Sequence, residues 1–271
     1  MGVVNTTPDS FYAHGRSLSA EAARARIEQL CAEGAQIADI GGESSRPGAL
    51  PVPATEQIAR IESALAHAVL TGKLMVSVDT TSPLVAEHAL ENGAVLVNDV
   101  SCLADPDLAR VAARFGAGLI LMHARSALGS MQGFSEYPDE AYVDVVADVR
   151  REWCQARDRA VAAGVPRENV WFDPGIGFDK NARQSFELLR RLGEFSDLGV
   201  PVVVGASRKS FIRAVDDVGP EERLGGTIAA CLWCATQGAR VLRVHDVRAV
   251  GQALSVTSRL DGGWSGGAAH V

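Results

Sequence analysis

Polar side chains recur at the ends of short apolar runs along this 271-residue chain. In chain order they are Asn5, Asp79, Asn98, Asp173, Ser207, Lys209, Arg243 and His245. Carboxylates and amides such as Asp173 and Asn98 form the donor–acceptor array that a flat heterocycle needs, and Lys209 suits a ring carbonyl. Gathering these groups is costly unless a ligand satisfies them. Together they predict a binding site.

The two C-terminal members of the series suggest a second chemistry. Arg243 and His245 are two residues apart, so they share one face of an extended strand, and both suit a phosphate group. Asn5 and Asp9 offer hard oxygen donors of the kind that Mg²⁺ prefers. This part of the sequence therefore predicts a site where Mg²⁺ bridges phosphate oxygens.

The elements that must position these groups alternate regularly. Short β-branched runs cover residues 2–5, 36–41, 74–79, 95–100, 118–123, 170–174, 200–207 and 240–245. Their apolar parts lack polar alternation, as expected of parallel strands buried on both faces. Ala-, Arg- and Glu-rich helical stretches cover residues 20–35, 54–70, 83–92, 108–115, 144–163, 185–192, 223–237 and 247–259.

Eight strands alternating with eight helices predict an α/β fold, a (β/α)8 TIM barrel. A doubly wound open sheet is the alternative, but it normally begins with a Gly-rich turn, whereas the first loop here reads NTTPDSFYAHGRS. Because active sites of such barrels lie at the C-terminal ends of the strands, the polar residues should meet there. We expect a single barrel domain over residues 1–260 and a disordered Gly-rich tail over 261–271.

Composition excludes several classes of function. The net charge is −7 and basic residues do not cluster, which argues against a nucleic-acid binder. No apolar run approaches the length needed to cross a bilayer, and the N-terminus does not look like a signal peptide. The five cysteines are scattered, and the CxxC of Cys231 and Cys234 lies in an apolar helical stretch. We therefore expect reduced cysteines and a cytoplasmic protein.

Eight motifs resemble the signatures of the bacterial dihydropteroate synthase family, in order and over essentially the whole chain. They are MGVVNTTPDSF (1–11), IGGESSRPGA (40–49), VSVDT (76–80), NDVS (98–101), MH (122–123), FDPGIGF (172–178), GASRKSF (205–211) and RVHDV (243–247). The resemblance implies a barrel that joins 6-hydroxymethyl-7,8-dihydropterin diphosphate to 4-aminobenzoate. It also implies a Mg²⁺ cofactor, inhibition by sulfonamides and a homodimer.

Carried over residue by residue, the resemblance assigns roles to the mouth of the barrel. The pterin would be held by Asp79, Asn98, Met122, Asp173, Lys209 and Arg243. The diphosphate would be held by Asn5, Ser45, Arg46, Arg243 and His245, with Asn5 also a metal ligand. The 4-aminobenzoate side would be formed by Phe11, Pro47, Phe178 and Ser207. The residues implied to act in catalysis are Asp79, Asp173, Lys209, Arg243 and His245.

Two other functions remain open on the sequence. One is a pterin-binding methyltransferase that passes a methyl group from a reduced folate to a corrinoid protein, although such a barrel has no need of the SRK and RVHD motifs. The other is a catalytically weakened paralogue, favoured by Tyr12-Ala13-His14 where the family usually has a Ser-Asp-Gly-Gly run. Within the family itself, reduced sensitivity to sulfonamides is a further alternative.

Overall fold

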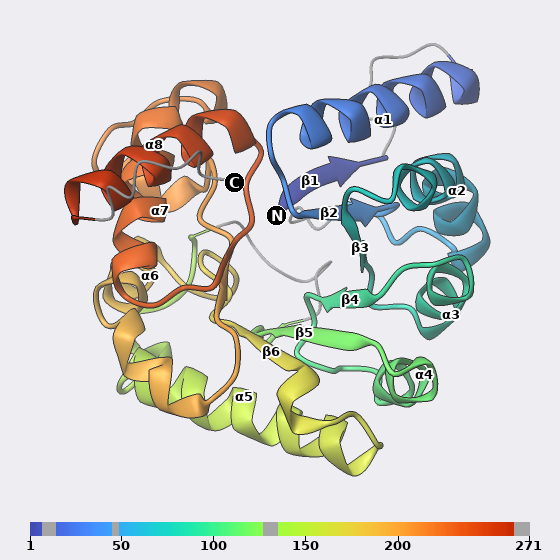
Figure 1. The fold of residues 1–271 in the computed structure, drawn as a ribbon. Coiled ribbons are helices and arrows are strands. Elements are labelled where there is room, and N and C mark those ends of the chain that lie inside the picture. Colours follow the sequence, from blue (N-terminus) through green and yellow to red (C-terminus); the bar gives the residue numbers. More distant parts are fainter. Residues whose placement is uncertain (7–14, 45–48, 127–134, 263–271) are drawn as a thin grey trace.

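The computed structural model describes residues 1–6, 15–44, 49–126 and 135–262, and in the first helix it describes side chains from residue 20 onward. Within these residues eight strands alternate with eight α-helices, which confirms the predicted barrel. The strands lie at the centre and the helices surround them (Figure 1). The expected tail falls almost entirely outside the described residues.

The first six strands form one parallel sheet in sequence order. They are β1 (Gly2–Asn5), β2 (Ile37–Gly41), β3 (Met75–Asp79), β4 (Leu96–Asp99), β5 (Gly118–Met122) and β6 (Val170–Asp173). Every pair is parallel and in continuous register, for example Asp79 opposite Asn98 and Met122 opposite Asp173. This register brings the polar ends of neighbouring strands to one level at one end of the barrel.

The last two strands are short and complete the ring. β7 (Val203–Val204) pairs with β8 (Val241–Leu242), and Phe172 N–H donates to the carbonyl of Pro201 to join β6 to the segment before β7. On the other side, Val3 N–H donates to the carbonyl of Val244 at 3.1 Å. The barrel is therefore closed by backbone hydrogen bonds between β1 and the segment that follows β8. Both strands are shorter than the sequence predicted.

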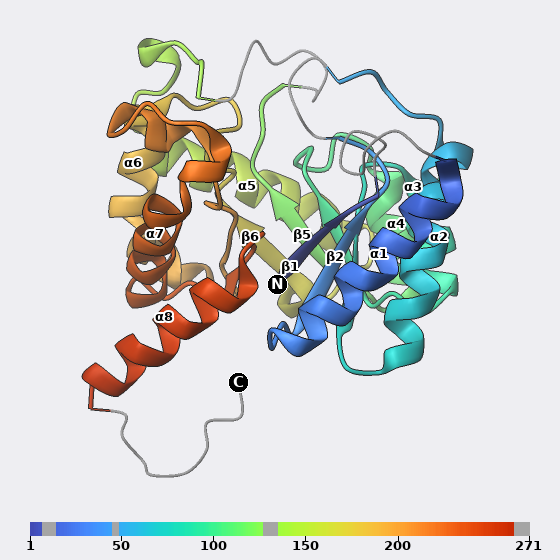
Figure 2. The same ribbon diagram turned by 90° about the horizontal axis from the view of Figure 1, so that it is seen from above.

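Eight α-helices follow the strands around the outside (Figures 1 and 2). They are α1 (Gly15–Ala32), α2 (Ala54–Thr71), α3 (Pro83–Glu91), α4 (Asp107–Phe115), α5 (Val145–Ala162), α6 (Ala182–Arg190), α7 (Leu224–Thr236) and α8 (Val247–Leu260). Short 3-10 helices precede or follow several of them: η3 (Asp139–Ala141), η4 (Arg167–Asn169), η5 (Leu192–Leu198), η6 (Ser210–Ala214) and η7 (Pro220–Glu222). No helix in the described ranges is long and apolar enough to cross a membrane.

The hydrophobic core lies between the strands and the helices rather than inside the barrel. Alternate strand residues such as Val76, Val78 and Leu121 belong to it, together with small helix residues such as Ala64 and Ala68. Because side chains on a strand alternate between faces, the intervening residues face the barrel interior. On β2, β3, β4 and β6 several of these are polar, among them the predicted site residues Asp79, Asn98 and Asp173.

Candidate active site

A fully buried carboxylate joins three strands inside the barrel. Asp39, in the middle of β2, accepts a hydrogen bond from Ser77 Oγ of β3 at 2.6 Å and from Asn98 Nδ2 of β4 at 3.0 Å. It also accepts from Arg243 Nε at 2.6 Å. All three partners donate, so the geometry is that of an ionised carboxylate.

Arg243 leaves the end of β8 and links two carboxylates on neighbouring strands. Its Nη2 donates to Asp79 Oδ2 at 2.7 Å while its Nε is bound to Asp39. The side chain is 22% exposed, so these charges are only partly hydrated. A planar guanidinium can serve both carboxylates at once, which a lysine at this position could not do with fixed geometry.

Asp79 has an unusual electrostatic environment. Burial raises the pKa of its carboxyl to about 7, although the nearby guanidinium of Arg243 opposes the shift. The charges of Asp39, Asp99 and Glu43 add to the increase. A carboxyl that titrates near neutral pH and faces the interior of a barrel is a common feature of functional sites.

The turn after β6 positions the second acidic group. Asp173 is buried, and its Oδ1 accepts from Gly175 N–H at 2.7 Å. Gly175 has φ +67°, and a side chain there would collide with the carbonyl oxygen of His123, so only glycine fits between β5 and this turn. Burial raises the pKa of Asp173 despite the nearby cation of Lys209.

Lys209 faces Asp173 across Gly205. A methyl group placed on Gly205 would lie 3.9 Å from Lys209 Nζ and 4.0 Å from Asp173 Oδ2, so the glycine leaves room for both groups. Nζ donates to the carbonyl of Ile176 and lies 4.4 Å from the centre of the Phe178 ring. Burial lowers the pKa of Lys209 to about 8, and Asp173 opposes this shift.

A small apolar cluster, separate from the main core, borders these polar groups. Val100, Met122 and Phe178 are all buried, and Ala124 packs against them. They come from the ends of β4 and β5 and from the turn after β6. Apolar side chains beside convergent polar groups are typical of pockets for flat organic ligands.

His245 and Ser207 lie at the ends of the last two strands. His245 N–H donates to Ser207 Oγ at 3.2 Å, and the same hydroxyl lies 3.0 Å from Nδ1 of the imidazole. In the tautomer in which Oγ donates its proton to Nδ1, Nε2 carries the ring proton and can donate to a ligand. Lost hydration and the charges of Arg243 and Arg208 lower the pKa of His245 below its usual range.

A buried lysine ties the loops after β5 and β6 together. Lys180 is fully buried, and its Nζ lies 2.9 Å from His123 Nδ1, 2.8 Å from the Phe178 carbonyl and 3.3 Å from the His123 carbonyl. Three acceptors match the three protons of an ammonium group. His123 Nε2 then faces Glu152 at 2.9 Å, so this histidine is part of the scaffold.

The structure brings most of the predicted site residues together. Asp79, Asn98 and Arg243 share one network, and Asp173, Lys209 and Phe178 share another. Asn5 is partly buried at the end of β1, opposite Gly41 in register. Five predicted residues lie outside the described part of the chain: Asp9, Phe11, Ser45, Arg46 and Pro47.

Sequence reasoning missed three contributors, namely Asp39, Ser77 and Lys180. The signal for Asp39 was present, since an acidic residue inside the apolar run IADIG needs a partner when the strand is buried. Arg208, by contrast, lies in the SRK motif, but its guanidinium is held by Asp246, which accepts from its Nε and Nη2.

No cluster of three or more His, Cys, Asp or Glu side chains suited to a metal occurs among the described residues. Asn5 is the predicted metal ligand that the structure does describe. Mg²⁺ commonly takes one or two protein oxygens and completes its shell with water and substrate phosphates. A single amide oxygen at the mouth is therefore compatible with a metal held mainly by a bound diphosphate.

A family model for pterin binding enzymes matches residues 1–245. The dihydropteroate synthase of Escherichia coli K12 is 38% identical over 258 residues, which cover 94% of this chain and 89% of that protein. The enzyme of a Synechocystis species is 40% identical over 96% of this chain and 89% of its own length. The chain belongs to the dihydropteroate synthase family.

Solved structures agree with this assignment. Dihydropteroate synthase of Xanthomonas albilineans with 4-aminobenzoic acid superimposes with a TM-score of 0.87 at 39% identity, covering 96% of this chain and 92% of that one. The Thermus thermophilus enzyme with 4-aminobenzoate gives a TM-score of 0.83 at 41% identity, covering 96% and 93%. The chain is thus a transferase of folate biosynthesis, and the methyltransferase alternative is not supported.

Proposed function

We propose that the mouth of this barrel joins 6-hydroxymethyl-7,8-dihydropterin diphosphate to 4-aminobenzoate, giving 7,8-dihydropteroate and pyrophosphate. The observation that carries the proposal is the convergence of Asp79, Asn98, Asp173, Lys209 and Arg243 at the ends of five different strands. A family member from Xanthomonas albilineans has been solved with 7,8-dihydropteroate.

The pterin fits between the two acidic groups. Asp173 and Asp79 would accept hydrogen bonds from ring nitrogens, and the Oδ1 of Asn98 is available because its Nδ2 is bound to Asp39. Lys209 would donate to the ring carbonyl, and Met122 would contact the ring through the apolar cluster. Charge-assisted hydrogen bonds in a site with little water are both strong and selective.

The diphosphate belongs at the opposite side of the mouth. His245 would donate from Nε2, and Arg243 would donate from its remaining nitrogen while its plane covers the pterin. Asn5 would bind the leaving group together with Ser45 and Arg46 of the second loop. Mg²⁺, held by Asn5 and the phosphate oxygens, would neutralise charge on the diphosphate.

The residues of the mouth suit cleavage of a carbon–oxygen bond. The CH₂–O bond breaks and its electrons leave with the pyrophosphate, while the amine of 4-aminobenzoate forms the new C–N bond and loses a proton to water. Positive charge develops on the pterin methylene, where the ionised carboxylates of Asp79 and Asp173 would stabilise it electrostatically. No strong base is required because an arylamine is neutral at pH 7.

The 4-aminobenzoate side rests on fewer described residues. Phe178 lies beside Lys209 at the edge of the pterin site, where its ring can contact the arylamine. Ser207 is hydrogen-bonded to His245, so it would lie between the 4-aminobenzoate site and the diphosphate site. Phe11 and Pro47 complete the assignment. Sulfonamides are expected to compete here, and a Yersinia pestis relative has been solved with a sulfonamide drug.

A turnover assay tests the proposal. Pyrophosphate release should require both substrates, and Arg243→Ala should reduce it at least tenfold more than Arg183→Ala, a control at an exposed arginine on α6. Pterin binding without pyrophosphate release would identify a weakened paralogue. Methyl transfer from methyltetrahydrofolate to a corrinoid protein would overturn the assignment.

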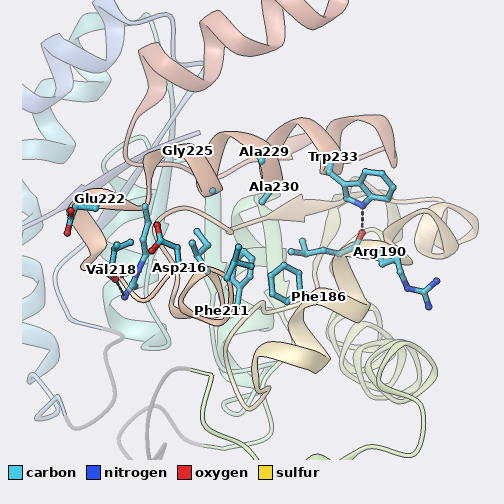
Figure 3. Close-up of a pocket in the computed structure, with 15 residues that line it drawn as sticks. Phe186, Arg190, Phe211, Asp216, Val218, Glu222, Gly225, Ala229, Ala230 and Trp233 are labelled. Atoms are coloured by element: carbon cyan, nitrogen blue, oxygen red, sulfur yellow. Dashed lines mark hydrogen bonds between the residues drawn. The ribbon is translucent and has the colours of Figure 1, made fainter.

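We further propose that the chain forms a homodimer in the cytoplasm through the outer face of α6 and α7. An apolar groove of about 680 Å³ lies there, lined by residues that include Phe186, Phe211 and Trp233 (Figure 3). Arg190 stands at one end of the groove and Glu222 at the other, so a second copy related by a two-fold axis can pair opposite charges. Trp233 is 46% exposed although α7 is strongly apolar.

Sedimentation of the full chain tests the interface. Trp233→Glu should convert the dimer to a monomer, whereas Leu84→Glu on α3, another exposed apolar position, should leave the dimer intact. A monomeric wild-type protein would refute the dimer, and a dimer that tolerates Trp233→Glu would place the interface elsewhere.

A further inference from the structure

The fully buried carboxylate of Asp39 touches two residues assigned to the pterin site but lies a layer below them. Its Oδ2 is shared by Asn98 Nδ2 and Arg243 Nε, and its Oδ1 is held by Ser77 Oγ. The residue shows no exposed surface, so a substrate in the mouth does not meet it directly. Its three hydrogen bonds join strands β2, β3 and β4 to the residue that follows β8.

We propose that Asp39 is the positioning residue of the pterin site, fixing the orientation of Asn98 and Arg243 and supplying the negative charge that acts on Asp79. The proposal rests on the proposed function for its substrate. It gives the strand β2 itself a role in the reaction. In this repeat the sequence predicted site residues only in the loop after β2, at Ser45, Arg46 and Pro47.

The orientation of Asn98 follows from the charge on Asp39. Only the amide nitrogen can donate to a carboxylate, so flipping the amide would bring its oxygen against Asp39 Oδ2. With the nitrogen at 3.0 Å from Asp39, the oxygen is turned away from that carboxylate. Asn98 therefore presents an acceptor to the pterin, and Asp39 sets this choice.

The orientation of Arg243 follows in the same way. Asp39 binds Nε and Asp79 binds Nη2, so the plane of the guanidinium is fixed at two points. Nη1 has no hydrogen-bond partner within the portion of the chain that the structure describes, which leaves it for a ligand. Without Asp39, Arg243 would be held by Asp79 alone and could rotate about that contact.

Asp39 also acts on the protonation of Asp79. The charged groups that act on Asp79 are Arg243, Asp39, Asp99 and Glu43. Among them Arg243 lowers the pKa of Asp79, and the three acidic groups raise it. Removing the charge of Asp39 removes one electrostatic repulsion on Asp79. It also leaves Asp79 as the one charged partner of the two that now share Arg243. Both changes favour the ionised form of Asp79 at lower pH.

The matched variants are Asp39→Asn and Ser77→Ala. Asp39→Asn keeps the shape and removes the charge, whereas Ser77→Ala removes one hydrogen bond to Asp39 and keeps the charge. For Asp39→Asn we expect kcat/KM for the pterin diphosphate to fall at least tenfold, with KM for 4-aminobenzoate within twofold of wild type. The acid limb of the pH profile for pterin binding should move to lower pH. Ser77→Ala should leave this limb in place.

Two results would overturn the proposal. One is a folded Asp39→Asn protein with an unchanged acid limb, and the other is an equal displacement of the limb in Ser77→Ala. The acid limb is measured by pterin binding and does not require turnover. Failure of the proposed function would instead appear as a wild-type protein that does not turn over, so the two failures can be told apart.

Nuclear magnetic resonance of the wild-type protein covers the case in which Asp39→Asn does not fold. The Nε–H signal of Arg243, assigned by comparison with Arg243→Lys, should be protected from exchange with solvent in the free protein and in the complex with the pterin diphosphate. Rapid exchange in either state would show that Asp39 does not fix the guanidinium and would refute the proposal.

Discussion

Replacing Asp173 by asparagine would remove one negative charge from the pterin site and change little else. The Oδ1 contact with Gly175 N–H at 2.7 Å can survive, since an amide oxygen also accepts from a backbone donor. The other oxygen, which faces the space shared with Lys209, would become an amide group. The turn after β6 should therefore keep its conformation while the charge is lost.

The expected loss of affinity follows from this geometry. Asp173 is 5% exposed, so its hydrogen bonds to a bound pterin are made with little water present. Losing charge-assisted hydrogen bonds in such a site costs about 2–4 kcal/mol, or roughly 30- to 1,000-fold in affinity. Lys209 adds a second effect, because the charge of Asp173 holds the pKa of this lysine up. In the variant the pKa of Lys209 should fall below about 8, and pterin binding should weaken further as pH rises through neutrality.

Calorimetry with the pterin diphosphate, without 4-aminobenzoate, measures both effects. Asp158→Asn provides the matched control, since that carboxylate lies on α5 with 65% of its side chain exposed. Thermal unfolding of the Asp173 variant should remain close to that of wild type. Pterin affinity within threefold of wild type at every pH would remove Asp173 from the pterin site and refute the reasoning.

Three further predictions follow from the same structure. Arg243→Ala should lower the free energy of unfolding by about 3 kcal/mol, because it leaves two carboxylates without their cation. The loss should grow from pH 5 to pH 8, because burial raises the pKa of Asp79 to about 7, so this carboxyl is neutral at pH 5 and becomes an unpaired buried charge as the pH rises. His245→Ala should reduce turnover about tenfold or more at saturating Mg²⁺, and normal turnover would remove it from the leaving-group site. Burial lowers the pKa of His123 to about 4, so only the unfolded chain takes up its proton between about pH 6.5 and 4. The contribution of His123 to the unfolding free energy should therefore fall by about 2 kcal/mol from pH 7 to pH 5, measured as the difference between wild type and His123→Asn at each pH.

The sequence predicted the fold because the barrel repeats one pattern eight times. Each buried strand was followed by a helical stretch, and a parallel ring forces the strand ends to one face. For that reason the sequence predicts that Asp79, Asn98 and Asp173 lie at the same end of the barrel, and the strand register agrees. The lengths of β7 and β8 were harder to predict from the sequence. Only two residues of each strand pair with the other, and the chain then leaves the sheet.

The residues that sequence reasoning missed have a shared physical cause. Asp39 and Lys180 act through partners that are distant in sequence, and a sequence pattern alone does not show which polar residue lies in the interior. Lys180 stands beside Asp179 and Asn181, in a segment that looks solvated, yet it is fully buried. Arg208 shows the reverse case, because its neighbours in the SRK motif face the site while Asp246 holds its guanidinium.

The most direct test of the account is turnover of a pterin diphosphate that carries ¹⁸O in the oxygen between the methylene and the phosphate. We expect equal amounts of unlabelled 7,8-dihydropteroate and of pyrophosphate with one ¹⁸O, in a reaction that depends on 4-aminobenzoate. Failure to form dihydropteroate, or retention of the label on the pterin, would contradict the claim that this barrel mouth breaks the carbon–oxygen bond to install the arylamine.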